Sequence, residues 1–438
     1  MGSYIPSSKK EREDMLQALG MQSYAELYSD IPEPLRYTKK LELPEGLSEF
    51  EVTQKIENLA SENKVFAHIF RGAGAYNHFI PAIVKQVTSK EEFVTAYTPY
   101  QAEISQGILQ SIFEYQTMIA ELTGLDASNA SVYDGATAVA EAAAMCRDKK
   151  KPAVCVSATV DPKILDVLKT YCFGSGAPVI VVPGKDGLTD LDAFSALDRK
   201  DIACLIIQSP NYYGLIEDGT SCAEKAHAIK AKLVMSVNPI SLALLKTPGE
   251  CGADIAVGEG QPLGLPLGFG GPYLGFMAAS KEMMRKLPGR IVGQTVDVDG
   301  KRAYVLTLQA REQHIRREKA SSNICSNEAL CAMTAAVYLA AMGPKGLLTA
   351  AESCLGNAHY LLSELEKVGF TRKYTGEFFH EFVTVCPLDA EELAEKLAAK
   401  GYLAGLPLSD KEMLWCATEV NTASEIEGLI SAIKEVLA

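Results

Sequence analysis

The sequence predicts an α/β protein with a large domain on a mostly parallel central sheet and a smaller C-terminal α/β domain. Short β-branched runs that are apolar throughout recur between residues 150 and 260, and helical stretches separate them. Strands of this kind that alternate with helices are typical of a parallel sheet covered on both faces. The chain of 438 residues is long enough for about two to four domains.

Composition and charge narrow the classes of function. Apolar residues make up 47% of the chain and charged residues 22%, as in an ordinary protein with buried cores. The net charge of −13 disfavours nucleic acid and anionic membrane surfaces as partners. The apolar stretch 329–342 is shorter than the roughly 20 residues that span a bilayer, so it predicts a buried helix.

The N-terminus and the cysteines favour the cytoplasm. The first 20 residues contain no apolar core of a signal peptide, and Glu11, Glu13 and Asp14 argue against a transit peptide. The eleven cysteines are scattered, mostly in apolar runs, and none forms a Cys-x-x-Cys pair. This usage is typical of buried thiols in a reducing compartment, and no zinc pattern pairs them with histidines, so no metal site is expected.

Residues 1–65 are predicted to form a helical arm. Ser8 is placed to cap a first helix that Gly20 ends, and Ser48 is placed to cap a second helix. A loop between the two helices contains Pro32, Pro34 and Pro44.

Residues 66–320 are predicted to form the large domain, which contains a long amphipathic helix ended by Gly124. Its predicted buried face, with steps of three and four residues, consists of Ile104, Ile108, Ile112, Tyr115, Ile119 and Leu122. Strands are expected at 154–156, 179–182, 202–208, 233–237 and 254–257, with helices at 162–170 and 221–230.

A stretch rich in glycine and proline lies inside this domain. Residues 249–275 hold nine glycines and three prolines, too many for regular structure, so a loop shaped by its backbone is expected. Such a loop allows close approach to a ligand or to another chain, and both interpretations stay open.

Residues 321–438 are predicted to form the small domain. Helices are expected near 326–342 and 346–367, strands near 378–386 and 412–416, and a helix at the end of the chain.

Gly135, Ala136 and Thr137 form the first candidate site. They follow a strand expected at Ala130–Tyr133 and open a helix expected over residues 139–147. A helix N-terminus offers free N–H groups and a partial positive charge, which suits a phosphate. An ordinary strand–helix turn, capped by Asp134 or Thr137, explains the same residues.

Two polar segments are further candidates. The first contains Tyr97, Thr98, Tyr100, Gln101 and Glu103, and either lines a site or begins the long helix. The second is the basic run 311–319, which is suited to clamp a carboxylate or phosphate but also matches a solvated helix face.

Several segments together resemble the P-protein family of the glycine cleavage system, and in particular the first (α) subunit of its two-subunit bacterial form. The segments are FRGAGAYN (70–77), TPYQAEISQG (98–107), EYQTMIAELTGL (114–125), GEGQPLGLPLGFGGPYLG (258–275) and VGQTVDVDGKRAYVLTLQAREQHIRREKASSNIC (292–325). The resemblance is most specific between about residues 65 and 340.

The resemblance implies an aspartate-aminotransferase-like fold, fold-type I of the pyridoxal phosphate enzymes. It implies a subunit of glycine dehydrogenase (decarboxylating), an oxidoreductase acting on the CH–NH₂ group, in an α2β2 heterotetramer. The complex decarboxylates glycine on pyridoxal phosphate and passes the aminomethyl group to the lipoyl group of H-protein. The lysine that holds the cofactor as a Schiff base belongs to the β subunit, so this chain is expected to bind no cofactor covalently and to be inactive alone.

The residues of this chain agree with that division of labour. Alignment with the β-subunit motif on Pro266 and residues 270–272 places Gln261 at the lysine position, and an amide forms no Schiff base. No lysine lies between Lys246 and Lys281, and Asn238 stands where a carboxylate is expected near the pyridine nitrogen. No residue of this chain is therefore expected to be catalytic.

The candidate segments take their roles from this resemblance. Tyr97, Thr98, Tyr100, Gln101 and Glu103 are expected to contact the partner site or its channel, whereas Gly135, Ala136 and Thr137 are a possible vestigial phosphate site. Two alternatives stay open: a self-sufficient pyridoxal phosphate enzyme that uses Lys246 or Lys281, and a scaffold subunit without contact to the active site.

Overall fold

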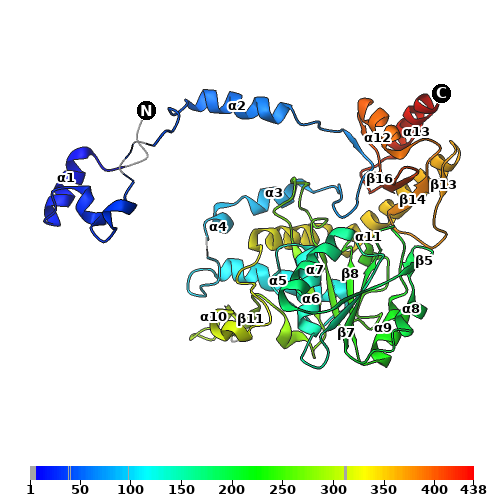
Figure 1. Cartoon of the computed structure of the whole chain (residues 1–438), viewed down its shortest axis with the longest axis horizontal. Coiled ribbons are helices and arrows are strands. Elements are labelled where there is room, and N and C mark those ends of the chain that lie inside the picture. Colours follow the sequence, from blue (N-terminus) through cyan, green and yellow to red (C-terminus); the bar gives the residue numbers. More distant parts are fainter. Residues whose placement is uncertain (1–5, 38, 40, 97, 310–312) are drawn as a thin grey trace. The chain divides into compact units, whose positions relative to one another are not determined.

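The computed structural model describes residues 6–37, 39, 41–96, 98–309 and 313–438 (Figure 1). Residues 1–65 and 66–438 form two separate packed units. The first unit contains α1 (Lys9–Ala18) and α2 (Glu49–Ser61), which Ser8 and Ser48 cap as predicted. In each capping box the serine hydroxyl accepts from a backbone N–H, and the glutamate three residues on accepts in return. The exposed apolar side chains of α2 include Phe50, Val52, Ile56 and Leu59.

A seven-stranded sheet forms the centre of the second unit. The strand order is β2-β10-β9-β8-β7-β3-β4, in which β10 is antiparallel to its neighbours and the pairs from β9 to β4 are parallel. The predicted mostly parallel sheet is therefore confirmed. The strands are β2 (Ala127–Ser128), β3 (Ala153–Ser157), β4 (Val179–Val182), β7 (Ile202–Ser209), β8 (Lys232–Val237), β9 (Ile255–Glu259) and β10 (Gly275–Ala279).

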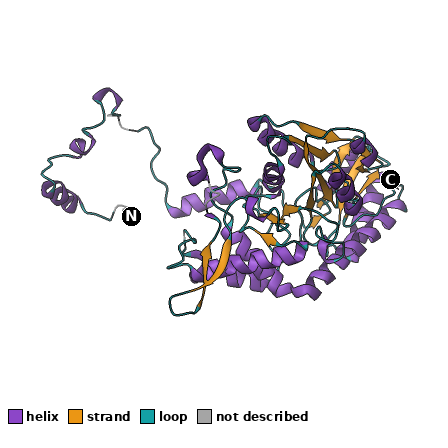
Figure 2. Ribbon diagram, turned by 90° about the horizontal axis from the view of Figure 1, so that it is seen from below, coloured by secondary structure: helices purple, strands orange, loops and turns teal. Residues whose placement is uncertain are grey.

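Helices cover both faces of this sheet (Figure 2). Successive strand residues point to opposite faces, so Leu233 and Met235 join one core while Val234 joins the other. This alternation explains why the strands are apolar throughout. The core that contains Val234 is covered by α6 (Gly135–Cys146) and α7 (Pro162–Ser175). The core that contains Leu233 and Met235 is covered by α5 (Gln106–Thr123), α9 (Gly219–Ala228) and α11 (Ala329–Glu366).

Two predicted details of the large domain are wrong. Helix α5 begins at Gln106, so Ile104 precedes it and is 78% exposed instead of lying on the buried face. Residues Ala130–Tyr133 form no strand, and only Val132 makes an isolated bridge, to Gly275. The backbone of Ser131 takes φ 135°, which breaks the extended run.

The long helix α11 connects two cores. Gly343, with φ 61° and followed by Pro344, interrupts it where the sequence predicts the gap between two helices. Residues before the break pack on the central sheet, and Ala358, Leu361 and Leu365 pack in the C-terminal core. By length and composition α11 is the only helix of the described part that could cross a membrane, but its buried side chains belong to these cores. The domain boundary at 320/321 stays a prediction.

The C-terminal core lies under an antiparallel sheet of order β13-β14-β17-β16. Its elements are β13 (Thr371–Arg372), β14 (Glu381–Val385), β16 (Leu406–Ser409), β17 (Glu412–Cys416), α12 (Ala390–Ala399) and α13 (Ala423–Leu437). The remaining elements are β1 (His68–Ile69), α3 (Ala82–Thr88), α4 (Glu91–Val94), β5 (Gly184–Lys185), β6 (Leu188–Thr189), α8 (Leu191–Ser195), β11 (Val292–Val296), β12 (Arg302–Leu306), α10 (Gln313–Arg316) and β15 (Tyr402–Leu403).

Candidate functional site

A cavity of 320 Å³ opens at the carboxyl ends of the parallel strands, where ligands bind in open α/β sheets. The loop 73–76, the N-terminus of α6 and the start of β14 all contribute to its lining. Among the described residues that line it, Lys163 is the one lysine or arginine. The lining carboxylates are Asp134, Asp161, Glu259 and Glu381. Because of this imbalance, the cavity is a poor match for an anionic ligand.

Glu259, at the end of β9, lies against the N-terminus of α6. Its Oε2 accepts a hydrogen bond of 2.9 Å from Gly135 N, and its Oε1 accepts from Gln261 N at 2.9 Å and Leu274 N at 3.0 Å. Burial raises the pKa of Glu259 to about 7, although these three hydrogen bonds act in the opposite direction. A Cβ on Gly135 would meet Glu259 N at 2.8 Å, so the helix and the strand approach too closely for a larger residue.

Gln261 is 1% exposed, and its amide group is fully engaged. Its Nε2 donates to Tyr76 O at 2.9 Å and to Leu265 O at 2.8 Å, and its Oε1 accepts from Tyr76 N at 2.9 Å. The side chain therefore ties the loop 73–76 to the glycine-rich stretch.

Asn238, at the end of β8, is likewise engaged within its own turn. Its Oδ1 accepts from Ile240 N at 2.9 Å and from Ser241 N at 3.4 Å, and its Nδ2 lies 3.4 Å from His380 Nε2. Burial lowers the pKa of His380 to about 3, so the His380 ring is neutral at neutral pH.

Glu381, the first residue of β14, holds the other side of the loop 73–76. It accepts hydrogen bonds from Ala73 N at 2.7 Å and from Tyr76 Oη at 2.8 Å. A Cβ on Gly72 would lie 2.4 Å from Glu381 Oε1, which explains a glycine of the FRGAGAYN segment without any ligand.

Replacing Glu381 with glutamine should change how stability depends on pH. Burial raises the pKa of Glu381 to about 7, from 4.5 in an exposed chain. Below pH 4.5 Glu381 is protonated in both the folded and the unfolded chain. Between pH 4.5 and 7 it stays protonated only in the folded chain. The stability that Glu381 contributes at low pH is therefore lost as the pH rises through this interval. We expect the wild type to lose on the order of 2 kcal/mol relative to Glu381→Gln across that interval, measured by denaturant unfolding. A stability difference between the wild type and Glu381→Gln that stays constant across this pH interval would contradict the prediction.

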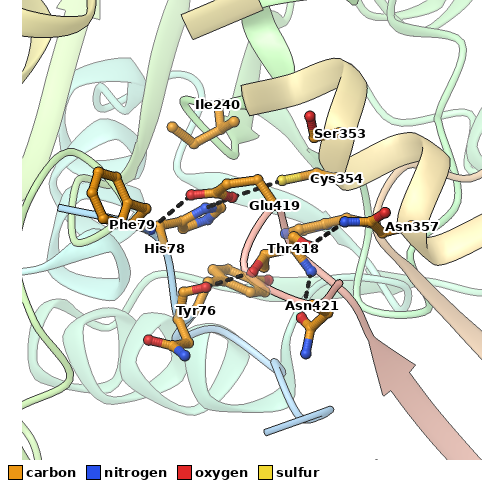
Figure 3. Close-up of polar contacts among 12 residues, drawn as sticks. Tyr76, His78, Phe79, Ile240, Ser353, Cys354, Asn357, Thr418, Glu419 and Asn421 are labelled. Atoms are coloured by element: carbon orange, nitrogen blue, oxygen red, sulfur yellow. Dashed lines mark hydrogen bonds and ion pairs between the residues drawn. The ribbon is translucent and has the colours of Figure 1, made fainter. Parts of the chain in front are cut away.

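A second polar cluster surrounds His78, which follows the loop 73–76 in the chain (Figure 3). Glu419 accepts from Phe79 N at 2.8 Å and Cys354 Sγ at 3.1 Å, and its Oε2 lies 2.7 Å from His78 Nδ1. Three side chains of metal-ligand type thus meet here. His78 Nδ1 and Cys354 Sγ already bond to Glu419 Oε2, so the cluster clamps residues 78–79 to α11 and to the segment after β17.

The predicted partner segment lies apart from this cavity. Thr98 and Gln101 line a separate hollow of 420 Å³, and Glu103 is exposed. Tyr100 Oη bonds to Ser326 Oγ at 2.8 Å and to Asn327 Oδ1, and the guanidinium of Arg290 lies 4.8 Å from the Tyr100 ring centre. Tyr97 and residues 311–312 of the basic run lie outside the described residues, and residues 313–319 are exposed.

A family model of the glycine cleavage system P-protein matches residues 2–433. The chain belongs to this family. A relative from Moorella thermoacetica, described as probable glycine dehydrogenase (decarboxylating) subunit 1, is 51% identical over all of both chains. The crystal structure of a glycine decarboxylase (P-protein) of the glycine cleavage system, in inhibitor-bound form, is 42% identical over 99% of this chain and 100% of that chain, with a TM-score of 0.93.

The predicted fold of this P-protein chain is also confirmed by more distant structures. An aspartate aminotransferase from Thermus thermophilus is 16% identical over 84% of this chain and 99% of that chain, with a TM-score of 0.59. At this identity the likeness shows the fold alone.

Pyridoxal phosphate, which membership of the P-protein family implies, does not fit the residues at the strand ends of this chain. The amide of Gln261 cannot replace a lysine amine, and the first N–H of α6 is bonded to Glu259. Sequence reasoning found Gln261 and Gly135 but missed Glu259, Glu381 and His380. A glutamate that ends an apolar strand beside a glycine was the available signal for Glu259.

Proposed function

We propose that this chain is the α subunit of a two-subunit glycine dehydrogenase (decarboxylating), active only with a β subunit that carries pyridoxal phosphate. Full-length relatives described as subunit 1 support the proposal. The observation that carries it is the buried Gln261 amide, because all three of its hydrogen bonds serve the fold. We propose an α2β2 assembly in the cytoplasm, with glycine and the lipoyl group of H-protein as substrates.

In this division of labour the cofactor, held by the β subunit, would supply an electron sink for the loss of CO₂ from glycine. This chain closes the partner site and excludes water from it. The exposed side chains of Thr98, Gln101 and Glu103 form the proposed contact surface, and Tyr100 holds this segment to Ser326. The exposed residues 313–319, which contain Arg316, Arg317 and Lys319 of the basic run, are proposed to order the contact or to receive an acidic carrier protein.

Glycine–bicarbonate exchange tests this proposal directly. We expect exchange from the mixture of this chain with the β subunit, and at most a few per cent of that rate from either chain alone. Full exchange by this chain alone would favour the self-sufficient enzyme instead. Borohydride would then trap pyridoxyl on a lysine, and Lys163 rather than Lys246 or Lys281 lines the cavity.

The reconstituted pair also shows whether this chain contacts the partner's active site or serves only as a scaffold. Glu103→Gln should lower the exchange rate without preventing assembly, because this exposed carboxylate belongs to the proposed contact segment. Glu395→Gln, on the exposed side of α12, is the matched control and should leave the rate unchanged. Equal rates for both variants would favour the scaffold.

A further inference from the structure

The N-terminus of α6 has the arrangement of a phosphate cradle. The helix is 12 residues long, begins at Gly135, and opens into the cavity at the carboxyl ends of the strands. Free N–H groups at such a position bind phosphates in many α/β proteins. In this chain, N–H groups at this position already have acceptors.

Two carboxylates of the chain itself occupy the cradle. Glu259 accepts from Gly135 N at 2.9 Å, and Asp134 accepts from Thr137 N at 2.7 Å. The second oxygen of Glu259 takes two further N–H groups, those of Gln261 and Leu274. One carboxylate thus gathers donors from the helix, from the glycine-rich stretch and from the entry to β10, much as a bound oxyanion gathers donors from several loops.

The absence of a side chain at Gly135, in the cradle, is also explained by Glu259. In a phosphate site a glycine lets the backbone approach the ligand, but here a Cβ on Gly135 would collide with the backbone and Cβ of Glu259, at 2.8 to 3.0 Å. Gly135 therefore makes room for the chain's own glutamate.

We infer that Glu259 takes the place of the cofactor phosphate and so excludes phosphate compounds from this subunit. A phosphate entering the cradle would have to break three hydrogen bonds of Glu259 and lie beside Asp134 and Glu259, with Lys163 as the one lysine or arginine among the described residues of the lining. The inference deepens the proposed function, since it names the residue that reserves the cofactor for the partner subunit.

Binding of inorganic phosphate and of pyridoxal phosphate to this chain alone tests the inference. At pH 8 we expect no saturable binding to the wild type below about 10 mM by calorimetry. Glu259→Ala uncovers three N–H groups and should bind both probes at least tenfold more tightly, whereas pyridoxal without phosphate should gain nothing. Glu217→Ala removes another buried carboxylate, bonded to Thr189 N and Asn211 Nδ2, and is the control that should gain no binding.

Two results would overturn the inference: saturable binding of phosphate to the wild type with a dissociation constant below about 10 mM, or a folded Glu259→Ala chain that binds phosphate no more tightly than the wild type. The wild-type binding measurement does not depend on any variant, so the inference stays testable if Glu259→Ala fails to fold. Glu259→Gln then serves as a second variant that keeps the side-chain shape, and it should bind phosphate more tightly than the wild type. Exchange by the reconstituted pair tests the proposed function separately, so failure of one does not imply failure of the other.

Discussion

Gly214→Ala is expected to lower the free energy of unfolding by about 3 kcal/mol or more, because it combines left-handed strain with a steric clash. Gly214 has φ +84°, and a Cβ at this position would lie 1.8 Å from Glu381 O. The carbonyl belongs to β14 and cannot move aside as a flexible side chain could.

The same substitution should also disturb the cavity. The loop after β7 pairs with the segment before β14, since Ile216 N donates to Glu377 O at 2.9 Å and Phe379 N donates to Gly214 O at 3.2 Å. Displacing this segment moves Glu381, which holds the loop 73–76 through Ala73 N and Tyr76 Oη. Reconstituted exchange activity should therefore fall together with stability.

Gly356→Ala provides the matched control for Gly214→Ala. Gly356 is exposed in the middle of α11, and a Cβ there would meet nothing within 4 Å. Alanine at such a position is expected to stabilise the chain by up to about 1 kcal/mol. Denaturant unfolding of both variants should give effects of opposite sign, and a Gly214→Ala variant as stable as wild type would contradict the role given to the clash.

The sequence predicts the central sheet well because its strands are buried on both faces. Such strands are apolar at most positions, as in Ile202–Ile207 of β7 and Leu233–Met235 of β8, and this signal can be recognised without knowing the neighbouring strands. The strand expected at Ala130–Tyr133 does not form, because the backbone of Ser131 takes a positive φ and interrupts the extended run. The amino-acid composition does not reveal this conformation. Strand β10 was missed because it starts at Gly275, the last residue of a stretch whose glycines predict a loop.

The candidate site was less predictable, since its contacts join residues far apart in the sequence. Gln261 bonds to Tyr76, Glu381 bonds to Ala73, and Glu259 bonds to Gly135. The resemblance locates the position of a missing lysine, but it does not reveal what the substituted side chain does. Only the folded arrangement shows that the replacing groups bond to the protein's own backbone.

Gln261→Glu tests most directly whether the Gln261 amide holds the loop 73–76, because it replaces only the amide nitrogen by oxygen. The Nε2 that donates to Tyr76 O and Leu265 O would become an acceptor facing two acceptors. Protonation of the new carboxyl could satisfy one of these carbonyls, but not both. We expect a loss of about 2–4 kcal/mol in the free energy of unfolding, from one unsatisfied buried carbonyl or from a buried charge.

The loss should be larger at pH 8 than at pH 5, because an ionised carboxylate at this buried position would lie near Glu259 and face the backbone oxygens of Tyr76 and Leu265. Gln86→Glu, an exposed position on α3, is the control for the change of charge and should cost less than about 0.5 kcal/mol at either pH. Equal stability of the two variants at both pH values would mean that the Gln261 amide does not hold the loop 73–76. The structural explanation for the missing lysine would then fail, even if the partner subunit alone binds the cofactor.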